Sequence, residues 1–383
     1  MKVLHVETGR HLYGGALQVR FLLDGLAARW PADEHVLACA RGAAIAVALR
    51  GRVRVVELPF GGDLDLSMPV RLRRLLQRER PDLVHLHSRR GADLWGGVAA
   101  RSLGIPVVLS RRVDNPEPRP WVALKYRLYD HVITISQGIR QVLLREGVPP
   151  AKVTCVPSAV DTETYRPGGD RAWLSAELGV PADAPVLAMA AQFIPRKGHD
   201  TLLDALPTVL ARQPGLRVLL FGQGPLRAQI AAAVERRGWA DRVLLPGFRE
   251  DLARILPAVD LLVHPARMEG LGVVLLQAAA CGIPLVAARA GGIPEVCVDG
   301  ETGWLVEPGD PAALAAALCA ALADPAEARR RGAAGRVLVE RSFSIPAMVA
   351  GNREVYLLAT GGRRRPLRRR PARPRGWSAS SPP

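Results

Sequence analysis

The stretch MEGLGVVLLQAAACGIPLV, from Met268 to Val286, is a helical apolar run that also carries two polar side chains, Glu269 and Gln277. If the run is helical throughout, these two residues are about 12 Å apart along the axis and lie on neighbouring faces. A helix that only packs against a core needs neither a carboxylate nor a glycine-rich entrance. We therefore predict that the N-terminal end of this helix faces a ligand, and that one of the two polar residues meets a sugar while the other meets a ribose.

The entrance to this helix carries few side chains. Backbone amides at a helix N-terminus, strengthened by the helix dipole, favour an anion such as a phosphate when no side chain shields them. We expect the amides of one short segment to bind that anion. The segment consists of Gly270, Leu271, Gly272 and Val273.

Two further glycine turns follow expected strands. ETGRHLYGGALQV joins the first strand to a helix through Gly14 and Gly15. FGQGPL forms a similar glycine turn through Gly222 and Gly224. Neither is a complete G-x-G-x-x-G, and the sequence has no Walker motif. Each is therefore either a phosphate-binding turn or simply a turn.

Arg196 and Lys197 lie in AAQFIPRKGHDTLL, between an expected strand and the following helix. Two cations beyond a strand's carboxyl end suit a diphosphate, since Arg binds it with two parallel hydrogen bonds and Lys acts as a point charge. Only four lysines occur in the chain. We therefore favour a role in binding over a solvated loop.

The elements that position these residues follow from the alternation of short apolar strands with helices in both halves of the chain. This alternation predicts βαβ units, parallel sheets and right-handed crossovers. We predict an α/β fold with two Rossmann-like domains, residues 1–165 and 166–340, facing each other across a cleft. A helix over 341–360 is expected to pack back toward the N-terminal domain. Ligands of open α/β sheets bind beyond the carboxyl ends of the strands, so the cleft is the expected site.

Length and composition agree with two cores. The chain has 383 residues, of which 49% are hydrophobic, and it lacks the roughly 18 consecutive apolar residues of a membrane span. The N-terminus has no signal-peptide pattern, and the five cysteines show no metal-site spacing, which predicts reduced thiols. We expect a cytoplasmic protein, with the inner face of the plasma membrane as a further location.

The net charge of +16 is unevenly distributed. Residues 361–383 hold eight arginines and no acid, and their Pro, Arg and Ser content predicts a disordered tail. This tail is either an electrostatic tether to anionic lipid or a solvated extension. Because half of the excess charge sits there, we expect no nucleic-acid partner, and a nucleic-acid-binding protein is kept only as an alternative.

Several segments together resemble glycosyltransferase family 4, whose members are retaining enzymes with the GT-B fold. EGLGVVLLQAAACGIPLVAARAGGIPEVCVDGETGWLV is similar to the family's donor-binding signature. SQGIRQVLLREGVPPAKVTCVPSAVDTETYRP, PRKGHDTLLDAL, PDLVHLHS and IPVVLSRRVDNP match in the expected order. The resemblance covers residues 1 to about 360 and looks closest to the branch that builds lipopolysaccharide or other cell-surface glycans.

The resemblance implies roles for individual residues. The amides of Gly14–Gly15 and Gly272–Val273, helped by Lys197, would hold the donor diphosphate. Glu269 would lie against the donor sugar, and the position of Gln277 would bind the ribose. The region of Phe248 and Arg249 would face the base.

This sequence departs from the family pattern at three positions. Gln277 stands where a second Glu is usual, and Gln192 stands where an Arg is typical, with Arg196 as its substitute. A His often follows the strand PVVLS, and we align Arg112 with that His. These differences affect the identity of the donor more than the fold.

These observations predict a retaining glycosyltransferase that moves a sugar from a nucleoside diphosphate sugar to a hydroxyl of a cell-surface glycan, a lipopolysaccharide core or a glycolipid. Glu269 and Arg112 are the predicted catalytic residues. Fixed cations and helix N-termini would stabilise the charge of the leaving diphosphate, so no metal or other cofactor is expected. The alternative enzyme is a nucleotide-sugar epimerase of the same fold.

Weaker candidates have simpler explanations. Asp63 and Asp65 form a D-x-D in a glycine loop without a third ligand nearby, and Glu295 suits the N-terminus of a helix. His85 and His87 share one strand face, where His87 either reaches the cleft or is a hydrogen-bonded core residue. VRLRRLLQRER and WVALKYRLYD are amphipathic and basic, which suits either contact with an anionic membrane or a solvated face.

Overall fold

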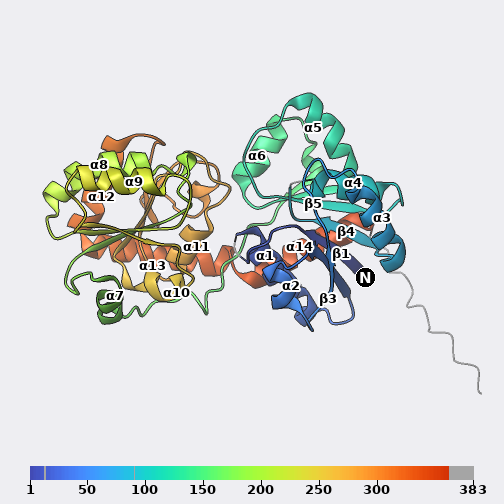
Figure 1. The fold of residues 1–383 in the computed structure, drawn as a ribbon, viewed down its shortest axis with the longest axis horizontal. Helices are drawn as coiled ribbons and strands as arrows, with labels where there is room; N and C mark the ends of the chain where they lie inside the picture. Colours follow the sequence, from blue (N-terminus) through green and yellow to red (C-terminus); the bar gives the residue numbers. More distant parts are fainter. Residues whose placement is uncertain (13, 90, 362–383) are drawn as a thin grey trace, which may run out of the picture.

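The computed structural model describes residues 1–12, 14–89 and 91–361. The described residues form two sheets side by side, each with helices on its faces (Figure 1). Every strand pair that they form is parallel. The predicted architecture of two Rossmann-like domains is confirmed. The expected tail lies outside the described residues, apart from Gly361.

The N-terminal sheet has seven strands, in the order β3 (Arg54–Leu58), β2 (Glu34–Ala40), β1 (Lys2–Glu7), β4 (Leu83–Leu86), β5 (Val107–Arg111), β6 (His131–Thr134) and β7 (Val153–Cys155). The C-terminal sheet has six, in the order β10 (Val243–Gly247), β9 (Arg217–Phe221), β8 (Val186–Ala190), β11 (Leu261–His264), β12 (Leu285–Ala288) and β13 (Gly303–Val306).

The helices that connect the strands cover both faces of each sheet. In the N-terminal domain they are α1 (Gly15–Arg29), α2 (Ala44–Leu49), α3 (Met68–Glu79), α4 (Ala92–Arg101), α5 (Arg119–Lys125), α6 (Gln137–Arg145), η1 (Tyr126–Leu128) and η2 (Pro150–Lys152). In the C-terminal domain they are α7 (Arg171–Leu178), α8 (His199–Arg212), α9 (Arg227–Arg236), α10 (Leu252–Ile255), α11 (Val273–Ala280), α12 (Pro311–Ala323), α13 (Pro325–Ser342), η3 (Pro195–Lys197), η4 (Leu256–Ala258) and η5 (Ile293–Glu295).

Side-chain alternation along β1 shows how each sheet is buried on both faces. Leu4 and Val6 pack into the cluster that contains Leu72 of α3, whereas Val3 packs on the opposite face with Leu22 of α1. Strands covered on both faces are apolar at almost every position, which explains the runs seen in the sequence.

The last helix, α14 (Ile345–Ala359), returns to the N-terminal domain, where it lies against α1 (Figure 1). Its Tyr356 is fully buried, and the hydroxyl lies 2.7 Å from Nδ1 of His85. The chain just before α14 is fixed by a hydrogen bond from the Val160 amide to the Phe343 carbonyl, 3.0 Å long. The C-terminal segment therefore ties the two domains together.

Among the described helices, none alone has the length and apolar character to cross a membrane, although α12 and α13, bent by 101°, pass that test as a pair.

The strand order reverses at the same point in both sheets. β1 lies between β2 and β4, and β8 lies between β9 and β11. At such a reversal, the connections from two neighbouring strands run in opposite directions. This leaves a crevice between them, and α/β sheets bind ligands in that crevice. The loops after β1, β8 and β11 carry most of the candidate residues.

A second contact between the domains involves Glu295 of η5. Its two carboxylate oxygens accept hydrogen bonds from the first amides of α6, those of Gln137 and Gly138, each 2.9 Å long. Gly138 is required there because a Cβ would lie 2.5 Å from the Gly291 carbonyl oxygen. The prediction that Glu295 serves a helix N-terminus is confirmed, and the helix belongs to the other domain.

Replacing Glu295 with Ala should weaken this contact, because two helix amides lose their acceptor. We expect the free energy of unfolding to fall by about 1–2 kcal/mol, the usual cost of a lost helix cap. Urea unfolding followed by circular dichroism measures the change, with the exposed Glu301→Ala as control. Equal stability of the two variants would contradict the assigned role.

Candidate functional site

The site is centred on Lys197 and Glu269, which are 72 residues apart in the chain and form a buried ion pair. Lys197 ends η3, after β8, and Glu269 lies in the loop after β11. β8 and β11 are neighbours with Leu187 opposite Leu261, so their carboxyl ends meet at one edge of the sheet. Sheet topology alone therefore brings these two loops together.

The Glu269 carboxylate is held by more than one partner. Oε2 binds Lys197 and also lies 2.8 Å from Nε2 of His264, the last residue of β11. Although burial acts to raise the pKa of Glu269, the hydrogen bond from His264 and the charge of Lys197 hold that pKa well below its usual range. Burial lowers the pKa of His264 despite the opposing effect of Glu269. A neutral His264 therefore donates from Nε2 to an ionised Glu269.

The two loops approach each other closely at Gly198. A Cβ on this residue would lie 2.0 Å from the Pro265 carbonyl oxygen, and its φ of +74° also favours glycine. The Arg267 amide donates to the Arg196 carbonyl at 2.9 Å, which joins the loops further. The position of Lys197 against Glu269 is thus set by backbone contacts as well as by charge.

The amides that begin α11 are open to a ligand. Gly272, with φ +87°, stands at the N-cap, and the helix starts at Val273, so Glu269 precedes the helix and is not part of it. Within the described part of the chain, the amides of Gly272, Val273 and Val274 donate no hydrogen bond. A Cβ on Gly272 would lie 3.5 Å from Cγ of Glu269, whose carboxylate binds Lys197. These unpaired donors form a site that favours an anion.

Arg112 links the glycine turns of the two domains. Its Cδ lies 3.4 Å from where a Cβ of Gly15 would be, and its carbonyl oxygen lies 2.8 Å from where a Cβ of Gly270 would be. Burial lowers the pKa of Arg112, and Glu7 opposes that shift. Among the described residues, no carboxylate lies within 4.0 Å of its guanidinium, and Nε is buried without a partner. A half-buried cation without a counter-ion is suited to receive an anionic ligand.

Other predicted donor residues already have partners in the protein. Arg196 donates to the Met268 carbonyl at 3.4 Å. The Gly222 amide donates to the Gly247 carbonyl, and a Cβ on Gly222 would lie 1.9 Å from the Ala191 carbonyl oxygen, so close packing explains this glycine. Their contact with a donor stays a prediction.

Two of the residues expected at the base and the ribose, Arg249 and Gln277, already bind other protein side chains. Arg249 forms ion pairs with Glu177 and Asp251, at 2.8 and 2.6 Å, and Phe248 is 46% exposed. The Gln277 amide donates to the Tyr165 hydroxyl at 2.9 Å. The side-chain carbonyl of Gln277 is still available to a ribose, and its assignment stays a prediction.

The histidines of the N-terminal domain form a buried network. His5 lies 3.0 Å from His87 and 3.2 Å from His35, so His87 is a hydrogen-bonded core residue. One ring nitrogen each of His5, His85 and His87 lies within 4.8 Å of the others, a spacing that could hold a metal ion. Burial lowers the pKa of each of the three. His5 bonds His87 and His35, whereas His85 bonds the hydroxyls of Tyr356 and Ser110.

The D-x-D motif does not present two unoccupied carboxylates. Asp65 accepts hydrogen bonds from the Gly61 amide, from Ser67 and from Arg71. These bonds, with Ser67 contributing most, lower the pKa of Asp65. Asp65 therefore stabilises its own loop, while Asp63 lines a separate pocket.

Sequence reasoning missed two residues of this site. His264 is a polar residue at the end of an otherwise apolar strand, a signal that was present in DLLVHP. Asp114 follows Arg112 by two residues, and its Oδ1 is buried without a partner. A Cβ on Gly291 would lie 3.0 Å from the other oxygen of Asp114. Nothing in the local sequence pattern marks this second residue.

The family described as Glycosyltransferase Family 4 matches residues 14–164, and the family described as Glycosyl transferases group 1 matches residues 170–337. A D-inositol 3-phosphate glycosyltransferase from Segniliparus rotundus is 37% identical over 312 residues, which cover 76% of this chain and 69% of that protein. The chain belongs to the family 4 glycosyltransferases.

Another relative matches a smaller part of this glycosyltransferase. A GDP-mannose-dependent alpha-(1-6)-phosphatidylinositol monomannoside mannosyltransferase from Mycolicibacterium smegmatis is 36% identical over 219 residues, covering 54% of this chain and 56% of the relative. The chain thus spans a little over half the length of this relative.

Solved structures agree on the fold. HepE from Anabaena, in complex with UDP, has a TM-score of 0.81 at 21% identity and covers 93% of this chain and 99% of its own. A glycosyltransferase from Rickettsia africae has a TM-score of 0.82 at 18% identity, covering 94% of this chain and 98% of its own. The glycosyltransferase therefore has the GT-B fold.

A Glu269→Gln substitution should destabilise the protein in a pH-dependent way. Because the folded-state pKa of Glu269 is depressed, its ionised form adds stability above the unfolded pKa of about 4.3, and this stability is lost as the pH falls below that value. Breaking a buried pair costs about 3 kcal/mol at pH 7.

Urea unfolding of both proteins at pH 7, 5 and 3.5 measures this difference. We expect the difference between wild type and variant to narrow by about 1 kcal/mol between pH 7 and pH 3.5, and the exposed Glu250→Gln serves as control. A difference that is constant over this range would show that Glu269 is not ionised in the folded protein.

Proposed function

We propose that this glycosyltransferase moves a sugar from a nucleoside diphosphate sugar to a hydroxyl of a glycan or glycolipid, with retention of anomeric configuration. The observation that carries the proposal is the buried Lys197 beside the unpaired amides of α11, at the strand reversal of the C-terminal sheet. A diphosphate is the ligand whose charge and size suit a fixed cation next to a helix N-terminus.

The donor diphosphate would lie between the two domains. Lys197 has three N–H donors, so it can keep Glu269 and bind a phosphate oxygen at once. Gly14 and Gly15 begin α1 on the facing domain, where Arg112 adds a second, half-buried cation. As the bond between the anomeric carbon and the phosphate oxygen breaks, these groups stabilise the charge on the leaving diphosphate.

Retention follows from attack on the same face of the sugar. The acceptor oxygen forms its bond to the anomeric carbon while its proton passes to the departing phosphate oxygen. Glu269 would orient the donor sugar or stabilise the positive charge that develops on its ring. The protein residues supply every charge that these steps require, so the proposal includes no metal.

The acceptor class is supported by the surface of the N-terminal domain. Leu64 and Leu66, in the loop before α3, are 92% and 74% exposed, and Val70 on α3 is also exposed. Arg73 and Arg74 follow on the same helix and are exposed too. Apolar side chains beside cations suit an anionic membrane surface, where a glycolipid acceptor would be found.

Replacing Lys197 with Ala should weaken binding of every nucleoside diphosphate alike, because it removes a charge that contacts phosphate and not the base. Thermal-shift titration with uridine, guanosine and adenosine diphosphates measures the effect, since a bound ligand raises stability by mass action. We expect at least a tenfold loss of affinity for the preferred nucleotide.

Arg212→Ala removes an exposed cation at the end of α8 and serves as the matched control. Unchanged affinity in the Lys197 variant would contradict the proposed diphosphate site. Conversion of a nucleotide sugar to its epimer without an acceptor, detected by proton NMR, would instead support the epimerase alternative.

A further inference from the structure

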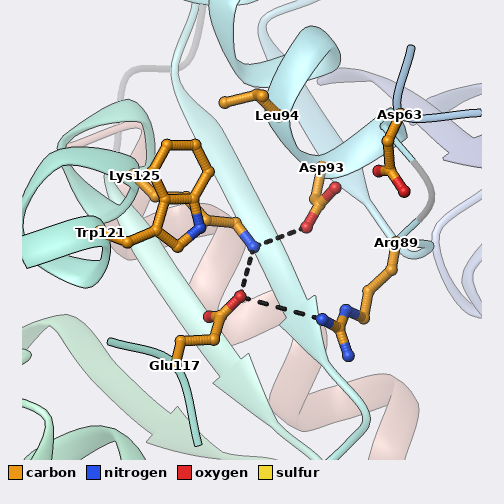
Figure 2. A pocket seen from close by; sticks show the side chains of 7 residues that line it. All are labelled: Asp63, Arg89, Asp93, Leu94, Glu117, Trp121 and Lys125. Atoms are coloured by element: carbon orange, nitrogen blue, oxygen red, sulfur yellow. Dashed lines mark hydrogen bonds and ion pairs between the residues drawn. The ribbon is translucent and has the colours of Figure 1, made fainter. Parts of the chain in front are cut away.

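A separate pocket of about 360 Å³ opens in the N-terminal domain (Figure 2). Its walls come from the loops after β3, β4 and β5 and from helices α4 and α5. Pockets that bind small molecules measure about 300–1,000 Å³. The residues that line it are Asp63, Arg89, Asp93, Leu94, Glu117, Trp121 and Lys125.

Two buried carboxylates and one ammonium lie at the centre of this pocket. Figure 2 shows the Lys125 ammonium with bonds to Asp93 and Glu117, which measure 2.8 and 3.0 Å. Lys125 is only 4% exposed, and Glu117 also pairs with Arg111 at 3.1 Å. Burying such a network gives folding little advantage over apolar residues of the same size. Its presence beside a cavity therefore points to a polar ligand.

The other side chains of the pocket are more exposed. The Arg89 guanidinium lies 3.9 Å from Glu117, a loose ion pair, with about half of its surface exposed. Asp63 is on the opposite side of Arg89 from Glu117 (Figure 2). Trp121 is 39% exposed and presents an aromatic surface to the pocket. The pocket therefore offers donors, acceptors and an apolar face together.

This combination selects a chemical class of ligand. Carboxylates accept hydrogen bonds from hydroxyl groups, Lys and Arg donate to them, and the C–H face of a sugar packs against an indole. A phosphate would meet three carboxylates, those of Asp63, Asp93 and Glu117, against two lining cations. Like charges at close range disfavour such a ligand.

We infer that this pocket binds a neutral sugar or polyol ring of the acceptor, an inference that rests on the proposed transferase function. The connection to the donor site is short. Arg111 contacts Glu117 of the pocket, and the next residue, Arg112, lies against Gly15 and Gly270. Consecutive residues at the end of β5 thus contact the pocket and the proposed donor site.

Saturation-transfer NMR with methyl α-mannopyranoside and myo-inositol tests this inference, with mannose 6-phosphate and inositol 1-phosphate as the anionic counterparts. We expect the wild type to bind a neutral probe more tightly than its phosphorylated counterpart. Trp121→Ala should lower the affinity for the neutral probe at least tenfold, and Trp121→Phe should keep most of it. Leu124→Ala, an exposed residue of the same helix that does not line the pocket, should leave it unchanged.

Three results would overturn the inference: neutral-probe binding that survives Trp121→Ala undiminished, tighter binding of the phosphorylated probes, or no neutral-probe binding by the wild type. Nucleoside diphosphate binding by the wild type is measured in the same samples. If that binding is absent, the proposed transferase function fails. If it is present while the neutral probes behave as in one of those three results, only the pocket assignment fails.

Discussion

A buried carboxylate must be matched by positive charge or hydrogen bonds, and Glu269 obtains both from Lys197 and His264. This requirement fixes the loop after β11 against the loop after β8. It also holds the Lys197 ammonium close to the loop that leads into α11, and this ammonium has three N–H donors. The free energy cost of burying these charges is large, and a structure that needed only to fold could avoid it with apolar residues. We propose that a ligand shares the cation.

The position of this ion pair follows from the strand order. In both sheets the strand order reverses at the first strand, β1 or β8. Each domain therefore offers an open crevice at the carboxyl ends of its strands. The glycine turn at Gly14–Gly15 occupies that edge in one domain, and Lys197 with Glu269 occupies it in the other. Arg112 contacts both glycine turns, and Glu295 and α14 hold the domains together.

The fold could be predicted, and candidate site residues could be proposed, because their signals are local. Periodic apolar runs predicted two Rossmann-like domains. Glycine-rich turns and paired cations next to strands indicated Gly15, Lys197 and Glu269 as candidates. The pairings could not be predicted, since the contact between Lys197 and Glu269 depends on which strands become neighbours. The bond from Glu295 to α6 depends on domain packing. The pocket around Lys125 could not be predicted either, because its residues come from five separate segments.

The most direct test is a crystal structure of the chain with a bound nucleoside diphosphate sugar. The account predicts that the diphosphate lies between the domains, within hydrogen-bonding distance of Lys197 and of the amides of Gly272 and Val273. A nucleotide bound with its phosphates away from both groups would contradict it.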